Sequence, residues 1–343
     1  MYADLLAKIQ AAFAAVFVSP GGRVGSNCQS SYVLALHFDL LPEALRQKAA
    51  ARLAEEVVKF GYHLTTGFVG TPYLCHVLHR FGYTDLAYEL LNQESYPSWL
   101  YPVKKGATTI WERWDGIKPD GTFQDAGMNS FNHYAYGAIG DWMYRVVAGL
   151  DTDAHEPGYQ HVLIQPQSGG GLMHARAVLD SPYGQIVSAW HLTDADLRLH
   201  VTVPPNAHAT VRIPAQDRSQ VTESGQPLDR VPGVASAVGQ DNAVVVEIGS
   251  GQYDFVSLGL NRTQAMAHVR HVAGRLDIAS SLRELLADER SKAILTQYVG
   301  EDMLSAPQIG WVMDQPFEAL ARFAPQVLTP ERLQSLQNEL LAL

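Results

Sequence analysis

The chain has 343 residues, of which 47% are apolar and 17% charged, and this composition excludes wholesale disorder, collagen and a coiled coil. At roughly 150 residues per domain, the length predicts two or three domains. Acidic residues outnumber basic residues by 35 to 25, and the net charge of −10 offers no electrostatic footprint for nucleic acid or an anionic membrane. We therefore expect neither as a partner.

The sequence lacks the signals of export, membrane insertion and cysteine chemistry. The apolar amino terminus is interrupted by Asp4, Lys8 and Gln10 and follows no basic segment, so no secretory signal is predicted. No apolar run approaches the roughly 20 residues of a membrane span. Cys28 and Cys75 lie too far apart to suggest a disulfide framework or a thiolate metal site, and both are expected to be buried apolar residues. These features predict a cytoplasmic protein.

Residues 1–150 have the pattern of short antiparallel helices. Leu5, Ile9 and Phe13 recur every fourth position and mark one face of the first helix, before Pro20, Gly21 and Gly22 break it. Proline near a first turn and glycine beyond a last turn indicate the other boundaries. We expect about six or seven helices, the clearest of them near 5–17, 29–39, 43–60, 71–81, 84–93 and 129–148.

The pattern changes near Asp151, where short β-rich runs begin, separated by Gly and Pro. A hairpin is predicted between Val244–Ile248 and Tyr253–Val256, because the glycines of Gly249-Ser250-Gly251 can adopt positive φ. Seven runs in about 100 residues predict an antiparallel β-sandwich, with strands near 161–165, 175–179, 186–191, 197–203, 209–213, 243–248 and 253–258.

The last residues return to a helical pattern. Leu282, Leu285 and Leu286 share one helix face, and Thr329 is the predicted N-cap of a final helix. That helix has an apolar face of Leu333, Leu336, Leu340 and Leu341. No reactive group of residues is found here, so we assign this segment a packing role. The predicted domains are 1–150, 151–260 and 261–343.

Two segments, Gly106–Gly116 and Asn129–Gly137, hold the densest group of chemically useful side chains. Glu112 lies between Trp111 and Trp114, and His133 lies in the second segment. Indole faces stack on the C–H faces of a sugar ring while a carboxylate activates water, so this combination is typical of carbohydrate hydrolysis.

Each of these residues also has a purely structural interpretation. Thr109 and Glu112 have the spacing of a capping box, which stabilises a helix start without catalysis. Arg113 and Asp115 fit a local ion pair. His133 is either a contact to a substrate hydroxyl or a hydrogen-bonded core histidine.

Other classes of site find little support. His76 with His79, and His268 with His271, have i, i+3 spacing, but no carboxylate or thiolate completes a metal set beside them. No nucleophile elbow, Walker loop or dinucleotide fingerprint is present. We therefore predict neither a metal nor a cofactor, and carboxylate-based hydrolysis is the chemistry that remains.

At these residues the sequence resembles the bacterial α-L-rhamnosidases of glycoside hydrolase family 78. The resemblance covers about residues 5–215, and the string Ala107-Thr108-Thr109-Ile110-Trp111-Glu112-Arg113-Trp114 is its most specific part. Further matching strings are Thr65–Thr71, Gly82–Tyr88, Tyr96–Trp99, Asn129–Gly137, Pro157–Tyr159 and Ser181–Gly184.

The resemblance implies an (α/α)6 barrel followed by a β-sandwich, and inverting hydrolysis of terminal α-L-rhamnosides by two carboxyl groups. It places Glu112 at the position of the general base and His133 at that of a histidine that contacts the sugar. Trp111 and Trp114 would be walls or supports of the sugar subsite. The implied substrates are rhamnose-containing glycosides.

The family's general acid lies upstream, in a segment of the type Asp-Cys-Pro-x-Arg-x-Glu, and the sequence contains no such segment. We therefore expect a partial (α/α)6 barrel, the antiparallel β-sandwich and a small helical segment. A partial barrel leaves apolar flanks uncovered, which predicts a homodimer or a partner that supplies the complementing barrel half. Two alternatives remain: a non-catalytic carbohydrate-binding or scaffold fragment, and a truncated, inactive gene product.

Overall fold

The computed structural model describes residues 2–266, 276–278, 280–306, 309–310, 312–313 and 315–340. The chain forms two compact units, one of Met1–Ile139 with Arg270–Leu343 and one of Gly140–Val269. None of the helices in these residues is both long enough and apolar enough to cross a membrane.

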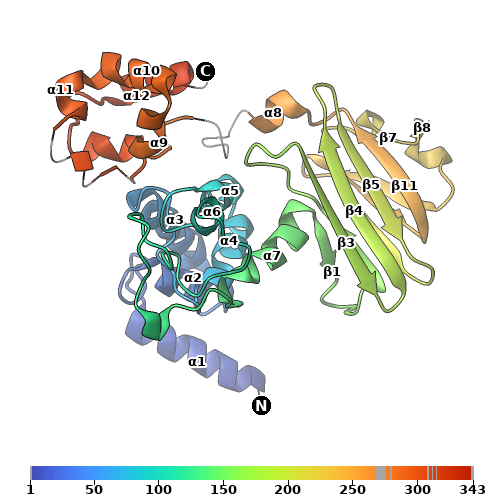
Figure 1. Ribbon diagram of the computed structural model, residues 1–343. Coiled ribbons are helices and arrows are strands. Elements are labelled where there is room, and N and C mark those ends of the chain that lie inside the picture. Colours follow the sequence, from blue (N-terminus) through green and yellow to red (C-terminus); the bar gives the residue numbers. More distant parts are fainter. Residues whose placement is uncertain are drawn as a thin grey trace. The chain divides into compact units, whose positions relative to one another are not determined.

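Helices α2 to α5 form the core of the first unit (Figure 1). Their apolar faces are buried because apolar residues recur at helical spacing, as at Leu53 and Val57 of α3 and at Leu74 and Leu78 of α4. Pro42 precedes α3 as its N-cap, as the sequence predicts. The helices are α2 (Gln29–His37), α3 (Glu43–Lys59), α4 (Thr71–Arg80), α5 (Thr84–Asn92) and the short α6 (Leu100–Lys104).

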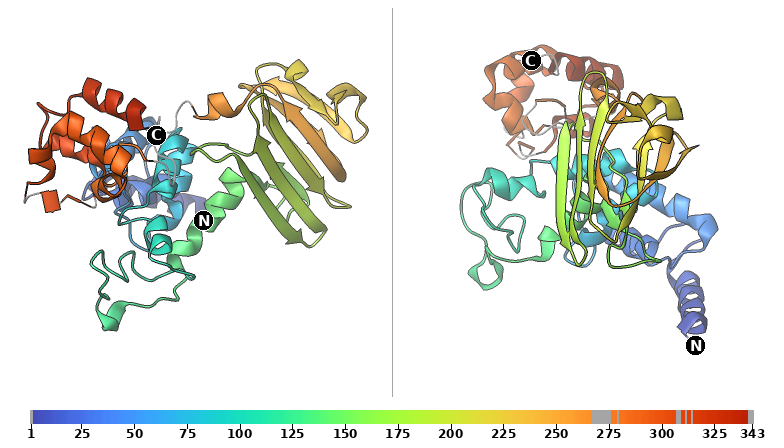
Figure 2. Two further views of the ribbon diagram at one scale, coloured as in Figure 1. Left: turned by 45° about the horizontal axis from the view of Figure 1, so that its top comes forward. Right: turned by 90° about the vertical axis from the view of Figure 1, so that its right-hand side faces the viewer.

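Helix α1 (Tyr2–Phe17) differs from the others because none of its residues is buried. It extends away from helices α2 to α5 in Figure 1 and in the right view of Figure 2. Its apolar side chains are largely exposed, with Leu5, Leu6 and Ile9 each about half accessible. The predicted helix is therefore present, but its apolar face is not covered by the described residues.

The single helix predicted over 129–148 is wrong. Asn129–Tyr134 has an irregular backbone because it pairs with the loop that contains Glu112. Short helical pieces follow, each of a different pitch: the 3-10 turn Ala135–Ala138, α7 (Ile139–Trp142) and a π-helical turn, Met143–Val147. Another 3-10 turn, Ala126–Met128, precedes them.

The second unit is a β-sandwich (Figure 1). One sheet has the order β1-β2-β6-β10-β9 and the other β3-β4-β5-β11-β7-β8. The seven predicted strands are present, and the sequence missed β1, β7, β8 and β9. The bounds are β1 Leu150–Thr152, β2 His161–Ile164, β3 His174–Ser181, β4 Gly184–Leu192, β5 Leu197–Val203, β6 His208–Pro214, β7 Val221–Glu223, β8 Gln226–Pro227, β9 Val234–Gln240, β10 Ala243–Ile248 and β11 Gly251–Ser257.

The hairpin predicted between β10 and β11 is wrong. Strand β10 pairs with β6 and β9 in the first sheet, whereas β11 pairs with β5 and β7 in the second. The segment Gly249–Ser250 therefore crosses from one sheet to the other. Each of the two strands already has a hydrogen-bonded neighbour on both sides, so no ladder forms between β10 and β11.

The core of the sandwich lies between inward-facing side chains of the two sheets. On β5 every second residue from Leu197 to Val203 is buried, which is the period-two pattern of a half-buried strand. The indole of Trp190 on β4 is buried and donates to the Val147 carbonyl at 2.7 Å. The π-helical turn is therefore anchored to this sheet.

The carboxyl-terminal helices bury their own apolar cluster within the first unit. Leu282 and Leu285 lie in it, as predicted, and Leu341 lies outside the described residues. Thr329 accepts a hydrogen bond from the Arg332 N–H at the start of α12, which fits an N-cap. The elements here are α9 (Leu282–Ala287), α10 (Glu289–Val299), α11 (Glu301–Leu304), the 3-10 helix Phe317–Arg322 and α12 (Pro330–Leu340), whereas α8 (Arg262–Met266) belongs to the second unit.

The two cysteines have different environments, and the prediction that both are buried holds only for Cys75. Cys28 is exposed directly before α2, where its Sγ lies 3.3 Å from Ser26 Oγ and 3.2 Å from Ser31 Oγ. A helix start leaves polar groups unsatisfied, and hydroxyl neighbours suit such a position better than apolar packing.

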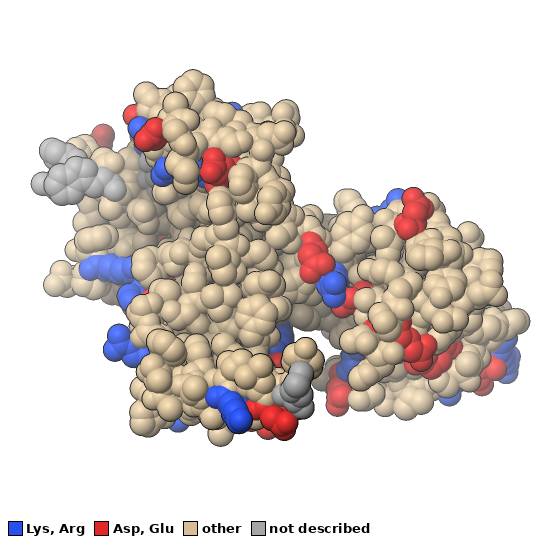
Figure 3. All heavy atoms as spheres, turned by 90° about the horizontal axis from the view of Figure 1, so that it is seen from below, with Lys and Arg blue, Asp and Glu red and all other residues tan. Residues whose placement is uncertain are grey.

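Charged side chains are interspersed on the face of the molecule seen in Figure 3, most of which is uncharged. Acidic and basic groups there lie singly or in small mixed groups. This distribution fits the low share of charged residues in the chain.

Candidate active site

The two segments that the sequence singles out lie side by side as paired loops. The Glu112 N–H donates to the Ser130 carbonyl at 2.9 Å, and the His133 N–H donates to the Ile110 carbonyl at 2.8 Å. The Thr109 hydroxyl donates to the Phe131 carbonyl. These bonds bring Glu112 and His133 into the same short stretch of paired backbone.

The capping-box interpretation of Thr109 and Glu112 is wrong. Residues 109–112 are not a helix start, and the hydroxyl and carboxylate both bond to the segment 130–131 rather than to each other's backbone. The spacing is right for a cap, but the neighbouring loop supplies the partners that a helix would otherwise supply.

The Glu112 carboxylate is half-buried and held on one side. Its Oε2 accepts a hydrogen bond from the Ser130 N–H at 2.8 Å. Among the residues that the structure describes, none donates to Oε1. A carboxylate oriented through one oxygen, with the other available, has the arrangement that a general base needs to bind a water molecule.

His133 is half-buried and is held by ring stacking. Its imidazole stacks on Phe68, with ring centroids 4.9 Å apart, and on Tyr134 at 5.3 Å. Its Nδ1 accepts a hydrogen bond from the Ala135 N–H at 3.3 Å, which leaves Nε2 as the protonated nitrogen. The ring is thus positioned with an N–H that can donate, and it is not a core residue.

The two tryptophans occupy different environments. Trp111 is 5% exposed and meets the edge of Phe131, so it supports the paired loops from below the surface. Trp114 is half-buried and stacks on Tyr136 with a centroid distance of 3.7 Å. Trp99, the third indole of this region, meets Trp114 edge-on and donates to the Tyr136 carbonyl.

Ionisable groups gather around the Tyr136 phenol. Burial raises its pKa; Tyr96, Asp115 and Glu112 raise it further, and Arg113 opposes them. A phenol with a raised pKa stays protonated near neutral pH and remains a hydrogen-bond donor. Tyr136 was not among the predicted site residues, although it lies within the quoted Asn129–Gly137 segment.

The predicted ion pair between Arg113 and Asp115 is present, with 3.4 Å between Arg113 Nε and Asp115 Oδ1. Gln124 donates a second hydrogen bond to the Asp115 carboxylate. Asp115 is therefore engaged on both oxygens, unlike Glu112.

The structure brings the predicted residues Glu112, His133, Trp111 and Trp114 into one region and adds three residues that sequence reasoning missed. These are Phe68, which stacks on His133, Ser130, whose backbone N–H holds Glu112, and Tyr136. Of these three, only Phe68 comes from a distant part of the chain. It lies in Thr65–Thr71, one of the strings that resemble the family, and that string is the sequence signal that could have identified it.

The histidine pairs considered for a metal have separate outcomes. His76 and His79 lie on α4, and neither belongs to a possible metal-binding group among the described residues. His268 and His271 lie outside the described residues.

Two family models match the chain. Residues 1–147 match the bacterial alpha-L-rhamnosidase 6 hairpin glycosidase domain, and residues 149–227 match the bacterial alpha-L-rhamnosidase C-terminal domain. The first of these matches contains the paired loops with Glu112 and His133.

Curated relatives carry the same family name. An alpha-L-rhamnosidase of Streptomyces avermitilis is 44% identical over 254 residues, which are 74% of this chain and 24% of that protein. One from Formosa agariphila is 39% identical over 66% of this chain and 24% of its own length. The chain thus spans about a quarter of the length of the relatives it matches.

Solved structures agree with these matches. The crystal structure of the Streptomyces avermitilis alpha-L-rhamnosidase complexed with L-rhamnose has a TM-score of 0.69 and 43% identity, covering 74% of this chain and 24% of that one. The crystal structure of the native alpha-L-rhamnosidase from Aspergillus terreus has a TM-score of 0.65 and 33% identity, and the match covers 75% of this chain and 27% of that one. Through residues 1–147 and 149–227, this chain belongs to the bacterial alpha-L-rhamnosidase family.

Proposed function

We propose that this chain contributes to the inverting hydrolysis of terminal α-L-rhamnosides, with Glu112 as the general base. The observation that carries the proposal is the Glu112 carboxylate, anchored at Oε2 by the Ser130 N–H within a region that matches the six-hairpin glycosidase domain. In an inverting reaction the base activates water on the ring face opposite the leaving group.

The neighbouring residues have supporting roles in this proposal. His133, stacked between Phe68 and Tyr134, binds a sugar hydroxyl through its Nε2–H. Trp114 forms part of the wall of the subsite, and the buried Trp111 supports the loop that carries Glu112. The substrate class, rhamnose-containing glycosides, is inferred from the relatives' name and from the relative complexed with L-rhamnose.

The test is turnover of an aryl α-L-rhamnoside by the purified protein and by Glu112→Gln. Loss of a general base lowers the rate by about 10²–10⁴-fold, and that is the expected effect. The first sugar product is expected to be the β-anomer, which proton NMR detects before it mutarotates.

The matched control is Glu289→Gln, which neutralises an exposed carboxylate on α10 and is expected to leave turnover unchanged. Turnover that survives Glu112→Gln contradicts the role of Glu112, and an α-anomeric first product contradicts inversion. Binding of L-rhamnose without turnover, measured by calorimetry, would instead favour the non-catalytic carbohydrate-binding alternative.

The expected homodimer or complementing barrel half is part of the same proposal. Sedimentation velocity of the protein across a concentration series tests self-association directly. A monomer at all concentrations removes the homodimer and leaves the separate complementing chain.

A further inference from the structure

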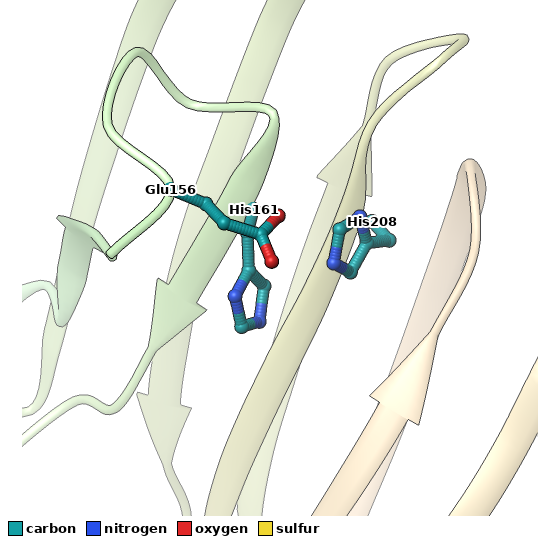
Figure 4. A group of neighbouring side chains, drawn as sticks. All are labelled: Glu156, His161 and His208. Atoms are coloured by element: carbon teal, nitrogen blue, oxygen red, sulfur yellow. The ribbon is translucent and has the colours of Figure 1, made fainter. Parts of the chain in front are cut away.

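A histidine pair and a glutamate meet at one end of the β-sandwich, far from Glu112 in the sequence. Strands β2 and β6 run parallel, and their register places His161 opposite His208. Paired positions on neighbouring strands project to the same face, so the imidazoles stack with centroids 4.5 Å apart. Glu156, in the loop between β1 and β2, brings its carboxylate between the rings in the view of Figure 4. One ligand atom from each residue lies within 4.8 Å of the others.

Hydrogen-bond contacts orient the His161 ring through both of its nitrogens. Its Nδ1 lies 2.9 Å from Asp153 Oδ2 and donates to that carboxylate. Its Nε2 lies 2.8 Å from the Thr210 hydroxyl oxygen. That hydroxyl donates its hydrogen to the Glu247 carboxylate, at 2.8 and 2.9 Å, so it has none left for Nε2. A metal ion at Nε2 therefore replaces the contact with Thr210, whose hydroxyl keeps its hydrogen bond to Glu247.

This arrangement has the parts of a transition-metal site. A histidine that binds a metal commonly donates its other ring N–H to a carboxylate, as His161 does to Asp153. Two imidazole nitrogens with one carboxylate oxygen suit Zn²⁺ rather than Ca²⁺ or Mg²⁺, which prefer oxygen ligands. We propose that Glu156, His161 and His208 bind one Zn²⁺ ion, with water as the fourth ligand.

Small side-chain movements complete the coordination. Zinc binds imidazole nitrogen at about 2.0–2.1 Å, so two such nitrogens on one ion lie at most about 4.2 Å apart. Glu156 is on an exposed loop and can rotate toward the two rings. The bound ion then ties the loop 153–160 to the ends of β2 and β6.

Isothermal titration of the untagged, metal-free protein with ZnCl₂ tests the site. We expect one ion per chain, and at least about tenfold weaker binding in His208→Ala and in Glu156→Gln, each of which removes a ligand. Asp153→Asn keeps all three ligands but removes the carboxylate partner of His161, and its expected effect is about 10–100-fold. Circular dichroism verifies that each variant is folded.

The matched control is His174→Ala. His174 and His191 also form a cross-strand pair, on β3 and β4, with ring centroids 6.4 Å apart. Among the described residues no carboxylate joins that pair in a metal-binding group. His174→Ala should therefore bind zinc as the unsubstituted protein does.

A second readout does not depend on any substitution. Co²⁺ at the site should give the intense visible absorption of a tetrahedral ion with nitrogen and oxygen ligands, and Zn²⁺ should displace it. The proposal is overturned if the unsubstituted protein shows no saturable binding. It is equally overturned if His208→Ala and Glu156→Gln bind as tightly as the parent, or if His174→Ala weakens binding as much as they do.

Discussion

Glu112 and Ser130 exchange hydrogen bonds through backbone and side chain together. The Glu112 N–H donates to the Ser130 carbonyl, and the Ser130 N–H donates to the Glu112 carboxylate. The carboxylate is thus fixed by groups that every residue except proline possesses, and the serine side chain is not needed. For this reason the hydrogen bond that holds the Glu112 carboxylate cannot be recognised from residue types in the sequence.

The two cysteines give a prediction at the same scale. Burial raises the pKa of the Cys75 thiol strongly. At Cys28 partial burial raises the pKa, but hydrogen bonds from Ser26 and Ser31 outweigh it, so the net shift is downward. The thiolate is the reactive form, and we therefore expect iodoacetamide to modify Cys28 in the folded protein while Cys75 is protected.

Peptide mapping by mass spectrometry after brief labelling measures this difference. Cys28→Ser should abolish labelling under native conditions, and urea should expose Cys75 in that variant. Labelling of Cys75 at a rate equal to that of Cys28 without denaturant would contradict the burial of α4.

At the scale of elements, the crossing between β10 and β11 shows how a local turn signal can mislead. Glycines beside Ser250 suit a tight hairpin, but each flanking strand already has two partners within its own sheet. Pairing with those strands buries the apolar faces of both sheets in one core. A two-stranded hairpin on its own would be marginally stable in water.

The junction between the π-helical turn and β1 gives a prediction for this scale. Gly149 has a φ of 72°, and a Cβ placed on it would lie 2.0 Å from the Pro166 backbone nitrogen. Gly149→Ala therefore combines backbone strain with steric overlap, and we expect a loss of about 2–5 kcal/mol in the free energy of unfolding. Urea denaturation followed by tryptophan fluorescence measures it.

Gly239 on β9 is the matched control, because its Cβ would meet open space and its φ is not positive. Gly239→Ala should unfold at nearly the same urea concentration as the unsubstituted protein. Equal stability of the two variants would show that the close approach of Gly149 to Pro166 is not maintained in solution.

For the whole molecule, histidines that the fold buries wholly or in part make stability depend on pH. Burial lowers the pKa of His63, and lowers those of His79 and His37 as well. In the unfolded chain a histidine titrates near 6.5, so between that value and the lower folded pKa the unfolded state binds more protons. The free energy of unfolding should therefore fall as pH decreases below about 6.5.

His63 is the strongest test of this dependence, because it is 3% exposed and bonds to Gly61 and Ser95. Urea denaturation at pH 7.5 and at pH 5.5 measures how much the free energy of unfolding falls between the two values. This fall should be smaller in His63→Gln than in the unsubstituted protein, by at most about 1.4 kcal/mol for each pH unit. His174→Gln, at an exposed position, should keep the full decrease. If the free energy of unfolding of His63→Gln falls as much as that of the unsubstituted protein, His63 does not contribute to the pH dependence.

Most helices of the first unit and the seven main strands of the sandwich are predictable from the sequence alone. The signals that predict them are local: hydrophobic periodicity, proline near the start of a helix and glycine at a break. Each of these depends on residues only a few positions apart. The sequence also determined the family, because the string around Glu112 is contiguous.

The pairing of distant segments, by contrast, is visible only in the folded chain. In the fold, Thr109 and Glu112 form hydrogen bonds to residues 130–131 instead of a capping box. The helix predicted over 129–148 is replaced by an irregular segment and short helical turns. Strands β10 and β11 lie in different sheets. The fold also brings Glu156 and His161 to His208, more than forty residues away in the sequence. The physical reason is that backbone and side-chain partners are chosen by burial and hydrogen-bond satisfaction over the whole chain, which no local pattern records.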